Sequence, residues 1–523
     1  MWRSAFFALL SCLIFAGTAL TRSAQAEISF SRAQDALLNE QIYGGGWTHF
    51  VGGGLAVFDC NQDQLPDFYA AGGSLPSRLY RNESKISGPL RFSIVADLPQ
   101  LTEVIGAYPI DINNDGAMDL VVLRNGANVI LQGHGQCKFT KAPASWGFAA
   151  GDEWTTAFSP TFEKGQVWPT LAFGNYVDEK NPDGPFETCD RNYLIRPEGE
   201  KFTPRIALEP GFCALSMLFS DWRRNGEVDL RISNDRQYYV RKGREQMWRL
   251  NPLREFGEAD QWPEIKIWGM GIASRDITND GLPDVVLTSM GDQLLQINQG
   301  NGTYKPAPYE KGTYATTPYV GDDGRPSTGW HAEFGDVNND GFDDLFIAKG
   351  NVDQMPSNAI HDPNNLLIQQ ADGHFVEMGA KTGLGTLERS RGASLVDLNR
   401  DGLLDILVIN RRANMEIWQN TSEKTGHWLL LDLRQNDHNR NAIGAIAEVK
   451  LPDGRILTQE NTIGGGHVSG KLTGLHFGLG QASQVEVRVT WPHGEASEWQ
   501  PIQPDQEWII EADANQTLRF KVK

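Results

Sequence analysis

The sequence predicts an all-β fold, in which a seven-bladed β-propeller is followed by a small C-terminal domain like a β-sandwich. Three observations carry this prediction. One acidic phrase returns at intervals of 52, 110, 55, 60 and 61 residues, each copy is followed by an apolar segment of strand length, and glycine and tryptophan are abundant, at 55 and 15 residues. A strand, tight loop and strand repeated at this period are typical of propeller blades with four strands each.

The acidic phrase defines the repeat units. In its complete form it reads D-x-N-x-D-G-x-x-D, and its copies begin at Asp59, Asp111, Asp221, Asp276, Asp336 and Asp397. The interval of 110 residues is about twice the others and indicates a degenerate copy near residues 173–183, which brings the number of units to seven. We therefore assign residues 27–425 to the propeller and residues 426–523 to the C-terminal domain.

The start of the mature chain is expected to close the ring. The phrase ISFSRA from Ile28 resembles the outer-strand phrases of the repeats, such as RFSIV from Arg91, but it precedes every acidic loop. The last repeat supplies only three strands of its own, so the Ile28 segment is expected to pair with it. Such closure removes the free sheet edges that invite aggregation. The alternative is an open β-solenoid, whose repeats are shorter.

The acidic phrase predicts calcium binding. Oxygen-bearing side chains at positions 1, 3, 5 and 9, with a glycine at position 6, are close to the first half of an EF-hand loop. Carboxylates crowded into nine residues repel one another unless a cation lies among them. The sequence therefore predicts about five structural Ca²⁺ sites. Their candidate ligands are Asp59, Asn61, Asp63, Asp67, Asp111, Asn113, Asp115, Asp119, Asp276, Thr278, Asp280, Asp284, Asp336, Asn338, Asp340, Asp344, Asp397, Asn399, Asp401 and Asp405.

Two copies depart from the pattern. The Asp59 loop has Gln64 where the turn glycine belongs, so its turn is expected to be strained or altered. In the Asp221 loop, Arg223 replaces the ligand at position 3 and Asn225 the carboxylate at position 5. We infer that Arg223 acts there as an internal cation between Asp221 and Asp229, which makes a loop without metal.

The N-terminus predicts export. A basic start at Met1–Arg3, an apolar run from Ala5 to Ala16 and the sequence Ala24-Gln25-Ala26 together indicate a cleaved signal peptide over residues 1–26. A membrane anchor is disfavoured because the run is short and no stop-transfer charges follow it. A lipoprotein processed at Cys12 is disfavoured because Leu10 and Ser11 make a poor lipobox. The protein is thus expected to be periplasmic or secreted, with no transmembrane span after cleavage.

Charge and cysteine content fit that compartment. The formal charge of −19 becomes 45 − 66 = −21 after residues 1–26 are removed, a balance that disfavours nucleic acid as a partner. Five calcium ions would reduce it to about −11. Four cysteines remain and allow three disulfide connectivities. Cys189 and Cys213 could staple one blade, whereas Cys60 and Cys137 are either disulfide-bonded or buried free thiols.

These residues resemble the FG-GAP or VCBS type of repeat found in seven-bladed propellers such as the integrin α head. The C-terminal phrases HWLLLDL from His427, GGGHVSG from Gly464 and VEVRVTWPHG from Val485 resemble the ASPIC and UnbV domain of bacterial relatives of cartilage acidic protein. The resemblance implies an extracytoplasmic binding protein and a calcium role for the loop residues. The departures at Gln64, Arg223 and Asn225 put two of those sites in question.

No catalytic motif stands out, since G-x-S-x-G, H-E-x-x-H and P-loop patterns are missing from the sequence. His49 and His331 could face the channel together and bind a metal or an anion, although ordinary packing or a polar surface position is the favoured interpretation. The tryptophans at 146, 154, 168 and 262 are candidates for a binding rim or for packing between strands, and Gly464–Gly466 for a ligand-cradling loop or a turn.

Two functions follow from these features. The leading hypothesis is an exported, calcium-binding propeller that acts as an interaction module for an unknown protein or carbohydrate ligand. The alternative is an enzyme or assembly factor with a site in the propeller channel, acting on polysaccharide or on a cofactor-bearing partner. The fold class does not choose between them, because propellers support both.

Overall fold

The fold is given by a computed structural model that describes residues 27–149, 151–184, 188–235, 240, 242–314, 327–351, 361–436, 438–512 and 518–523. The signal peptide predicted over residues 1–26 lies outside these residues. Within them, almost all regular structure is β-strand, joined by four short 3₁₀ segments and one helical turn, α1 (Gly379–Thr382). The predicted all-β class is confirmed.

The described residues form seven sheets of antiparallel strands that lie side by side. Six of these sheets contain four strands that are consecutive in the chain, and the seventh contains three consecutive strands and one strand from the N-terminus. We number these blades 1 to 7. Blades 1 to 3 comprise β2 (Leu55–Phe58), β3 (Asp67–Ala70), β4 (Arg78–Asn82) and β5 (Phe92–Ile94); β6 (Val104–Ile110), β7 (Asp119–Arg124), β8 (Val129–Gly133) and β9 (Phe139–Lys141); β10 (Thr155–Thr161), β11 (Thr170–Asn175), β12 (Asn192–Ile195) and β13 (Ile206–Leu208).

Blades 4 to 6 follow the same plan. They comprise β14 (Ala214–Ser220), β15 (Asp229–Asn234), β16 (Gln246–Arg249) and β17 (Arg254–Glu255); β18 (Gly269–Arg275), β19 (Asp284–Ser289), β20 (Leu294–Asn298) and β21 (Tyr304–Pro306); β22 (Gly329–Gly335), β23 (Asp344–Lys349), β24 (Asn365–Gln369) and β25 (Phe375–Glu377). The four 3₁₀ segments are η1 (Trp47–His49), η2 (Ala144–Trp146), η3 (Glu258–Asp260) and η4 (Tyr309–Lys311).

Blade 7 joins the two ends of the propeller sequence. Its strands β26 (Ser390–Val396), β27 (Asp405–Asn410) and β28 (Glu416–Asn420) are completed by β1 (Phe30–Arg32), which pairs antiparallel with β28. The innermost strands of successive blades contact one another around the ring, including β26 with β2. The prediction that the Ile28 segment closes the last blade is confirmed.

Burial follows position in the ring. Every residue of the innermost strands β6, β10, β14 and β26 is buried, whereas the outermost strands β5 and β9 bury only their first residue, a phenylalanine. An innermost strand is covered on both faces by neighbouring blades, so its sequence is rich in small and apolar residues rather than alternating. The core clusters accordingly run between adjacent blades.

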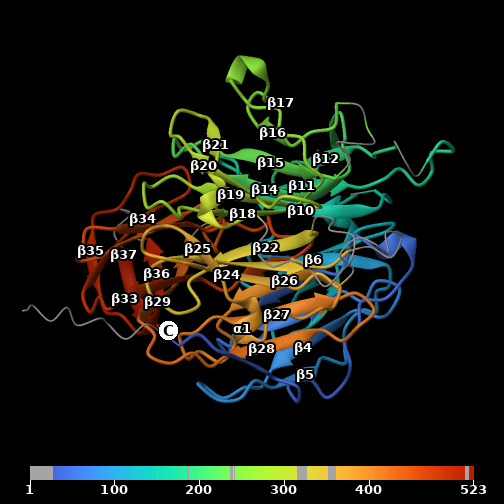
Figure 1. Ribbon diagram of the computed structural model, residues 1–523. Coiled ribbons are helices and arrows are strands. Elements are labelled where there is room, and N and C mark those ends of the chain that lie inside the picture. The colour runs from blue at the N-terminus through green and yellow to red at the C-terminus, as the bar shows by residue number, and fades with distance from the viewer. Residues whose placement is uncertain are drawn as a thin grey trace, which may run out of the picture.

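The C-terminal residues form two packed sheets at one side of the propeller (Figure 1). One sheet has the order β33-β29-β36-β37, and the other β31-β30-β34-β35. Their inner faces share one apolar core, as expected of a sandwich. The strands are β29 (His427–Arg434), β30 (Ile446–Lys450), β31 (Ile456–Glu460), β33 (Leu475–Gly480), β34 (Val485–Thr490), β35 (Gln500–Ile502), β36 (Gln506–Ala512) and β37 (Leu518–Val522).

One C-terminal strand leaves the sandwich. β32 (Gly470–Leu472) lies between β31 and β33 in sequence but pairs parallel with β2, the innermost strand of blade 1.

Among the described residues, no helix has the length and apolar character needed to cross a membrane.

Candidate metal loops and a plugged channel

The five acidic loops share one backbone conformation. Each connects the first and second strands of a blade, and positions 4 and 6 are both left-handed. The φ values are 62° and 76° at Gln62 and Gln64, 57° and 87° at Asn114 and Gly116, 58° and 87° at Asn279 and Gly281, 56° and 85° at Asn339 and Gly341, and 57° and 86° at Arg400 and Gly402. Gln64 thus keeps the turn rather than altering it, at the steric cost of a left-handed residue with a side chain.

Backbone amides orient the carboxylates at both ends of each loop. The aspartate at position 1 accepts the N–H of position 6 at 2.7–2.9 Å in all five loops. The aspartate at position 9 accepts the N–H of the last residue of the third strand of its blade, as from Asn82 to Asp67 at 2.7 Å and from Asn420 to Asp405 at 2.8 Å. Each carboxylate oxygen has two lone pairs, so these bonds leave acceptor capacity for a cation.

The side chains at positions 3 and 5 turn toward each other. Asn113 Nδ2 donates to Asp115 Oδ2 at 2.8 Å, and Asn338 Nδ2 donates to Asp340 Oδ2 at 2.9 Å. A half-turn of either amide would place its oxygen beside the carboxylate instead. Among the described residues, however, no loop brings ligand atoms from three of its carboxylates within 4.8 Å of one another. The third carboxylate would therefore have to approach when an ion binds.

The chemistry of the loops fits a hard cation. In the Asp397 loop, Asn399 is fully buried, and its Oδ1 at ligand position 3 has no hydrogen-bond partner. Burial, together with the neighbouring carboxylates of the same loops, raises the pKa of Asp111 and Asp276 to about 6 and that of Asp67, Asp284 and Asp397 to about 7. Oxygen donors crowded without a counter-charge are the environment that Ca²⁺ binds.

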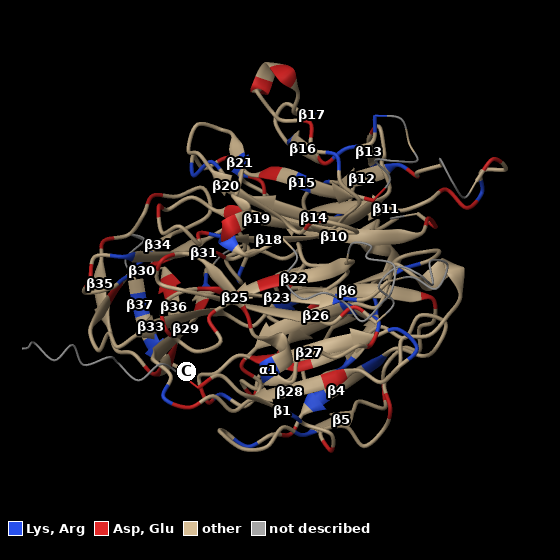
Figure 2. Cartoon of the chain, in the orientation of Figure 1, with Lys and Arg blue, Asp and Glu red and all other residues tan. Residues whose placement is uncertain are grey.

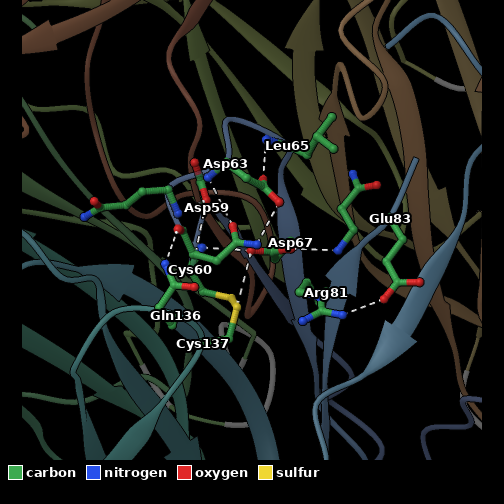
Figure 3. The surroundings of a disulfide bond; sticks show 12 residues. Asp59, Cys60, Asp63, Leu65, Asp67, Arg81, Glu83, Gln136 and Cys137 are labelled. Carbon is green, nitrogen blue, oxygen red and sulfur yellow. Dashed lines mark hydrogen bonds and ion pairs between the residues drawn. A yellow bond between two sulfur atoms is a disulfide. The ribbon is translucent and has the colours of Figure 1, made fainter. Parts of the chain in front are cut away.

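Both disulfides connect adjacent blades. Cys60, at position 2 of the Asp59 loop, bonds to Cys137 in the turn between β8 and β9 of blade 2 (Figure 3). The Cys60 N–H also donates to Asp67 Oδ2 at 2.8 Å, so this disulfide braces the loop directly. Cys189 lies between β11 and β12 of blade 3 and bonds to Cys213, which immediately precedes β14 of blade 4. The expectation that this pair staples one blade is therefore wrong.

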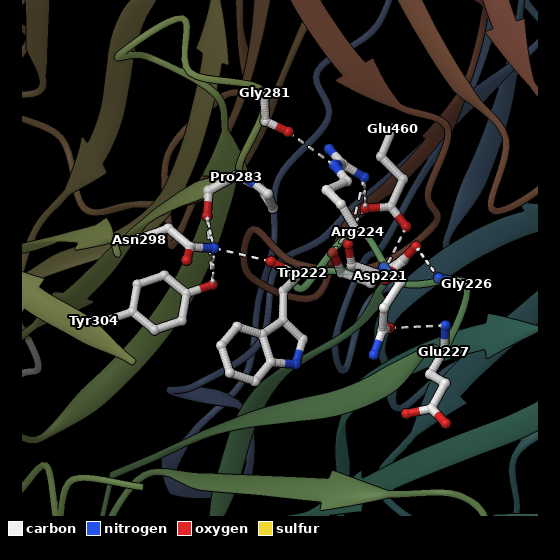
Figure 4. A network of polar contacts seen from close by, with 12 residues as sticks. Asp221, Trp222, Arg224, Gly226, Glu227, Gly281, Pro283, Asn298, Tyr304 and Glu460 are labelled. Carbon is white, nitrogen blue, oxygen red and sulfur yellow. Dashed lines mark hydrogen bonds and ion pairs between the residues drawn. The ribbon is translucent and has the colours of Figure 1, made fainter. Parts of the chain in front are cut away.

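The Asp221 loop contains an arginine–carboxylate ion pair in place of the oxygen donor set of the other acidic loops. Arg223 lies 3.1 Å from Asp229 and 2.9 Å from the exposed Glu227, and Trp222 Nε1 donates to Asp229 at 2.8 Å. Position 1 is held from outside the loop, because Glu460 accepts the Asp221 N–H at 2.9 Å (Figure 4). The pairing of Arg223 with Asp229 is as inferred from the sequence; an ion pair of Arg223 with Asp221 is not formed.

Blade 3 places its first loop elsewhere than the sequence indicated. Residues 173–183, the expected degenerate copy, begin inside β11 and run into the connection toward β12. The equivalent of the acidic loops is 162–169, between β10 and β11. There Glu163 pairs with Arg196 at 2.7 Å and accepts from Thr170 at 2.7 Å. Blades 3 and 4 thus both substitute an arginine–carboxylate pair for the donor set of the other five.

The C-terminal domain covers the face that carries these loops. Arg400 pairs with Glu507 at 2.5 Å, Arg455 donates to the Gly341 carbonyl at 2.8 Å, and His493 Nε2 lies 2.7 Å from the Phe162 carbonyl. Charged residues of both signs meet along this boundary (Figure 2). Together with contacts from Glu460 to the Asp221 loop and from Arg440 to Asn114, these contacts join the first loops of five blades to one domain.

From that domain, residues 463–472 enter the ring and contact the innermost strand of every blade. We call this segment the plug. Its contacts are Leu55 N to Ser469 Oγ at 3.2 Å, a bridge between Ala107 and Ser469, Ser159 Oγ to the Ile463 carbonyl at 2.7 Å, Gly465 N to the Met217 carbonyl at 2.7 Å, Gly466 N to the Ile272 carbonyl at 2.6 Å, His467 N to His331 Nδ1 at 3.0 Å, and Lys471 Nζ to the Leu395 carbonyl at 2.7 Å.

A segment that touches all seven innermost strands must occupy the axis of the ring. A cavity of about 150 Å³ lies beside the plug where it meets β18 and β22, and a cavity of about 570 Å³ borders its end at Lys471 and Leu472. Small residues of the inner strands make room for the plug. A side chain at Gly106, for example, would collide with the Val468 carbonyl. Gly464–Gly466 are thus neither a ligand cradle nor a simple turn but the part of the plug whose backbone bonds to β14 and β18.

The two channel histidines do not form a common site. His49 lies 2.9 Å from Glu103, whereas His331 contacts Glu333 at 3.3 Å and accepts the N–H of His467 from the plug. His467 itself is buried against Trp330, with ring centroids 5.0 Å apart, and burial lowers its pKa to about 3. It is therefore a neutral packing residue. The four candidate rim tryptophans, Trp146, Trp154, Trp168 and Trp262, are all buried and pack against other aromatic rings.

Three solved structures similar to this chain have low sequence identity to it. BBS1N in complex with ARL6DN is 10% identical over 73% of this chain and 96% of that one, with a TM-score of 0.44, and the Dos1 propeller is 9% identical over 73% and 94%, with a TM-score of 0.39. An Agrocybe aegerita lectin that recognises non-reducing terminal N-acetylglucosamine is 14% identical over 68% and 88%, with a TM-score of 0.37. No curated protein sequence matches significantly.

Family models match both parts of the chain. The FG-GAP-like repeat matches residues 59–122, 276–347 and 336–408, which contain the five acidic loops and leave out the two loops with arginine pairs. The ASPIC and UnbV model matches residues 435–517, which contain the plug. The chain therefore contains FG-GAP-like repeats, which lie in a β-propeller, and an ASPIC and UnbV domain that follows them.

Proposed function

We propose that this protein is an exported, calcium-stabilised propeller that acts as an interaction module for a protein or a glycan. The plug is the observation that favours this function over a channel enzyme. It occupies the axis where a propeller enzyme would bind its substrate, and it is held by hydrogen bonds to the inner strands. A partner would accordingly bind at the outer surface.

Calcium supports this module from within. Five loops of one conformation present carboxylate, amide and hydroxyl oxygens, and one of these oxygens, Asn399 Oδ1, is buried without a donor. The candidate ligands are those predicted from the sequence, with Asp63, Asp115, Asp280, Asp340 and Asp401 at position 5. A bound ion would neutralise the crowded carboxylates and stiffen the connection between the first two strands of a blade.

The face away from the C-terminal domain is the more accessible one. It carries the loops that precede the first strand of each blade, including η1, where half-buried Trp47 stacks on Phe50 with centroids 4.5 Å apart. Export is supported by the N-terminal sequence and agrees with two disulfides, which form and persist in oxidising compartments.

Thermal unfolding of the mature protein in excess calcium and in excess chelator, combined with elemental analysis, tests the proposal. Several equivalents of bound calcium and a calcium-dependent rise in melting temperature are expected, since each independent site at a hundredfold excess over its Kd contributes about 2.7 kcal/mol. A protein without bound metal and with identical melting in both buffers would contradict the calcium role. Screening the holoprotein against a glycan array, with a Trp47→Ala variant alongside, then addresses the ligand.

A further inference from the structure

The five acidic loops differ in how deeply they are buried. In the Asp59, Asp111 and Asp276 loops, the carboxylates at position 5, Asp63, Asp115 and Asp280, are exposed. In the Asp336 and Asp397 loops the corresponding residues are partly buried. Because the backbone of all five loops is the same, this difference comes from what lies on top of them.

Strands of the ASPIC and UnbV domain cover the Asp336 loop. Gly426 N and Gly480 N donate to the carbonyls of Asn338 and Asn339, at 3.2 and 2.8 Å. Asp336 is 2% exposed and Asn338 is 4% exposed. A surface groove of about 960 Å³ still borders Asn338 and Asp340. Arg455 also lines this groove, with its guanidinium 4.3 Å from the centre of the Phe342 ring and donating to the Gly341 carbonyl.

The Asp397 loop is covered in a similar way from β29, β33 and β36. Trp428 packs against Gly402, His476 Nε2 lies 3.1 Å from the Gly402 carbonyl, and Glu507 pairs with Arg400. Asp397 is 6% exposed and Asn399 is fully buried. A cavity of about 570 Å³ borders Asp397. An ion bound in either loop would therefore lie partly beneath the domain, whereas the ligands at positions 3 and 5 of the other three loops are half-buried or exposed.

We propose that the docked ASPIC and UnbV domain shields the ions of the Asp336 and Asp397 loops, so that these two ions exchange more slowly than the other three. This inference rests on the proposed calcium role. Lifting the domain also withdraws the plug, so complete uncovering of these two loops requires an opening of the whole interface. Such openings are slower than local loop motions.

Calcium release from the loaded mature protein tests the inference. The holoprotein is mixed with an excess of a fluorescent calcium chelator in a stopped-flow instrument, and the released calcium is calibrated against the total. We expect a fast phase and a slow phase with amplitudes in the ratio of three to two. Release of all ions in one fast phase would overturn the enclosure, whereas a protein that carries no calcium would overturn the proposed function instead.

Variants separate enclosure from general stability. Arg455→Ala removes a hydrogen bond and a cation–π contact over the Asp336 loop and is expected to accelerate the slow phase about tenfold, the equivalent of about 1.4 kcal/mol. Glu507→Gln weakens the cover of the Asp397 loop in the same way. Arg488→Ala is the matched control, because Arg488 pairs with Glu448 at 2.6 Å within the domain's own sheet. Equal effects of Arg455→Ala and Arg488→Ala would overturn the inference.

Discussion

The Asp221 loop offers a constructive test of how these loops work. Arg223 and Asn225 occupy the positions that hold a ligand amide and a carboxylate in the other loops, whereas Asp221, Gly226 and Asp229 already match the pattern. Its backbone also matches, with left-handed φ values of 52° at Arg224 and 78° at Gly226. The double substitution Arg223→Asn with Asn225→Asp is therefore expected to add one calcium site.

The magnitude follows from what Arg223 does now. Asp229 is 1% exposed and its charge is balanced by Arg223 at 3.1 Å. Removing one partner of a buried ion pair costs about 3–5 kcal/mol, and we expect the lower end because Arg223 is itself partly exposed. Calcium at a hundredfold excess over its Kd returns about 2.7 kcal/mol. The double variant should be clearly destabilised in chelator and close to the parent protein in calcium.

Elemental analysis and calorimetric melting in the two buffers measure both effects. Arg223→Lys is the matched control, since it keeps a cation beside Asp229 and should add no metal. The reasoning is refuted if the double variant binds no more calcium than the parent and if the difference in melting temperature between the two proteins is the same in calcium as in chelator. Loss of stability without added calcium would show that the loop needs more than its donor set to bind an ion.

Three further outcomes are expected from other parts of the chain. Gly106→Ala should lower the melting temperature by overpacking the plug against the Val468 carbonyl, at a cost of about 1–3 kcal/mol, and unchanged melting would mean a loosely seated plug. Replacing Cys60 and Cys137 by serine opens a covalent loop that spans 77 residues and should lower the free energy of unfolding by about 4–5 kcal/mol. Melting with and without a reductant measures this loss. A parent protein whose melting temperature does not respond to the reductant would contradict the prediction. Burial raises the pKa of Glu245 to about 8, so the folded state holds a proton that the unfolded state releases, and the free energy of unfolding falls by up to about 1.4 kcal/mol for each unit that the pH rises. Glu245→Gln should abolish this part of the pH dependence. Parallel melting profiles of the two proteins from pH 5 to 9 would refute the prediction.

Features repeated along the chain could be predicted from the sequence. The acidic loops can be recognised in the sequence because the same side chains must recur wherever the same turn and the same donor set recur. The closing strand at Ile28 was predictable for a related reason. Its sequence resembles an outer strand but belongs to no repeat of its own, and the last blade lacks one strand. Both inferences depend on comparing the chain with itself.

The loop of blade 3 could not be located in this way. Residues 162–169 contain one acidic residue, Glu163, and its partner Arg196 lies on the far side of two strands. An acidic stretch a few residues later, ending at Asp183, resembled the repeat more closely although it follows the second strand. Where an arginine–carboxylate ion pair replaces the acidic donor set, the side chains no longer share a pattern with the other blades.

The plug was hidden for a different reason. Most of its bonds to the blades use its backbone N–H and C=O groups, as at Ile463, Gly465 and Gly466, and any sequence carries those groups. Three consecutive glycines indicate conformational freedom, with φ values of 127°, 68° and 53°, but not the partner that the freedom serves. Only the assembled ring supplies seven strands within reach of one segment.

Because of this arrangement, the propeller is completed by both ends of the chain. β1 must return to blade 7 before the ring has no free edge, and the plug must arrive from beyond residue 460 before the inner strands are covered on the axis side. The plug enters and leaves through the same sandwich, between β31 and β33, so it can insert into a closed ring without threading a knot. Ring closure can therefore precede plugging. If the loops bind calcium as proposed, ions could reach all five loops at that stage, before the docked domain shields the Asp336 and Asp397 loops.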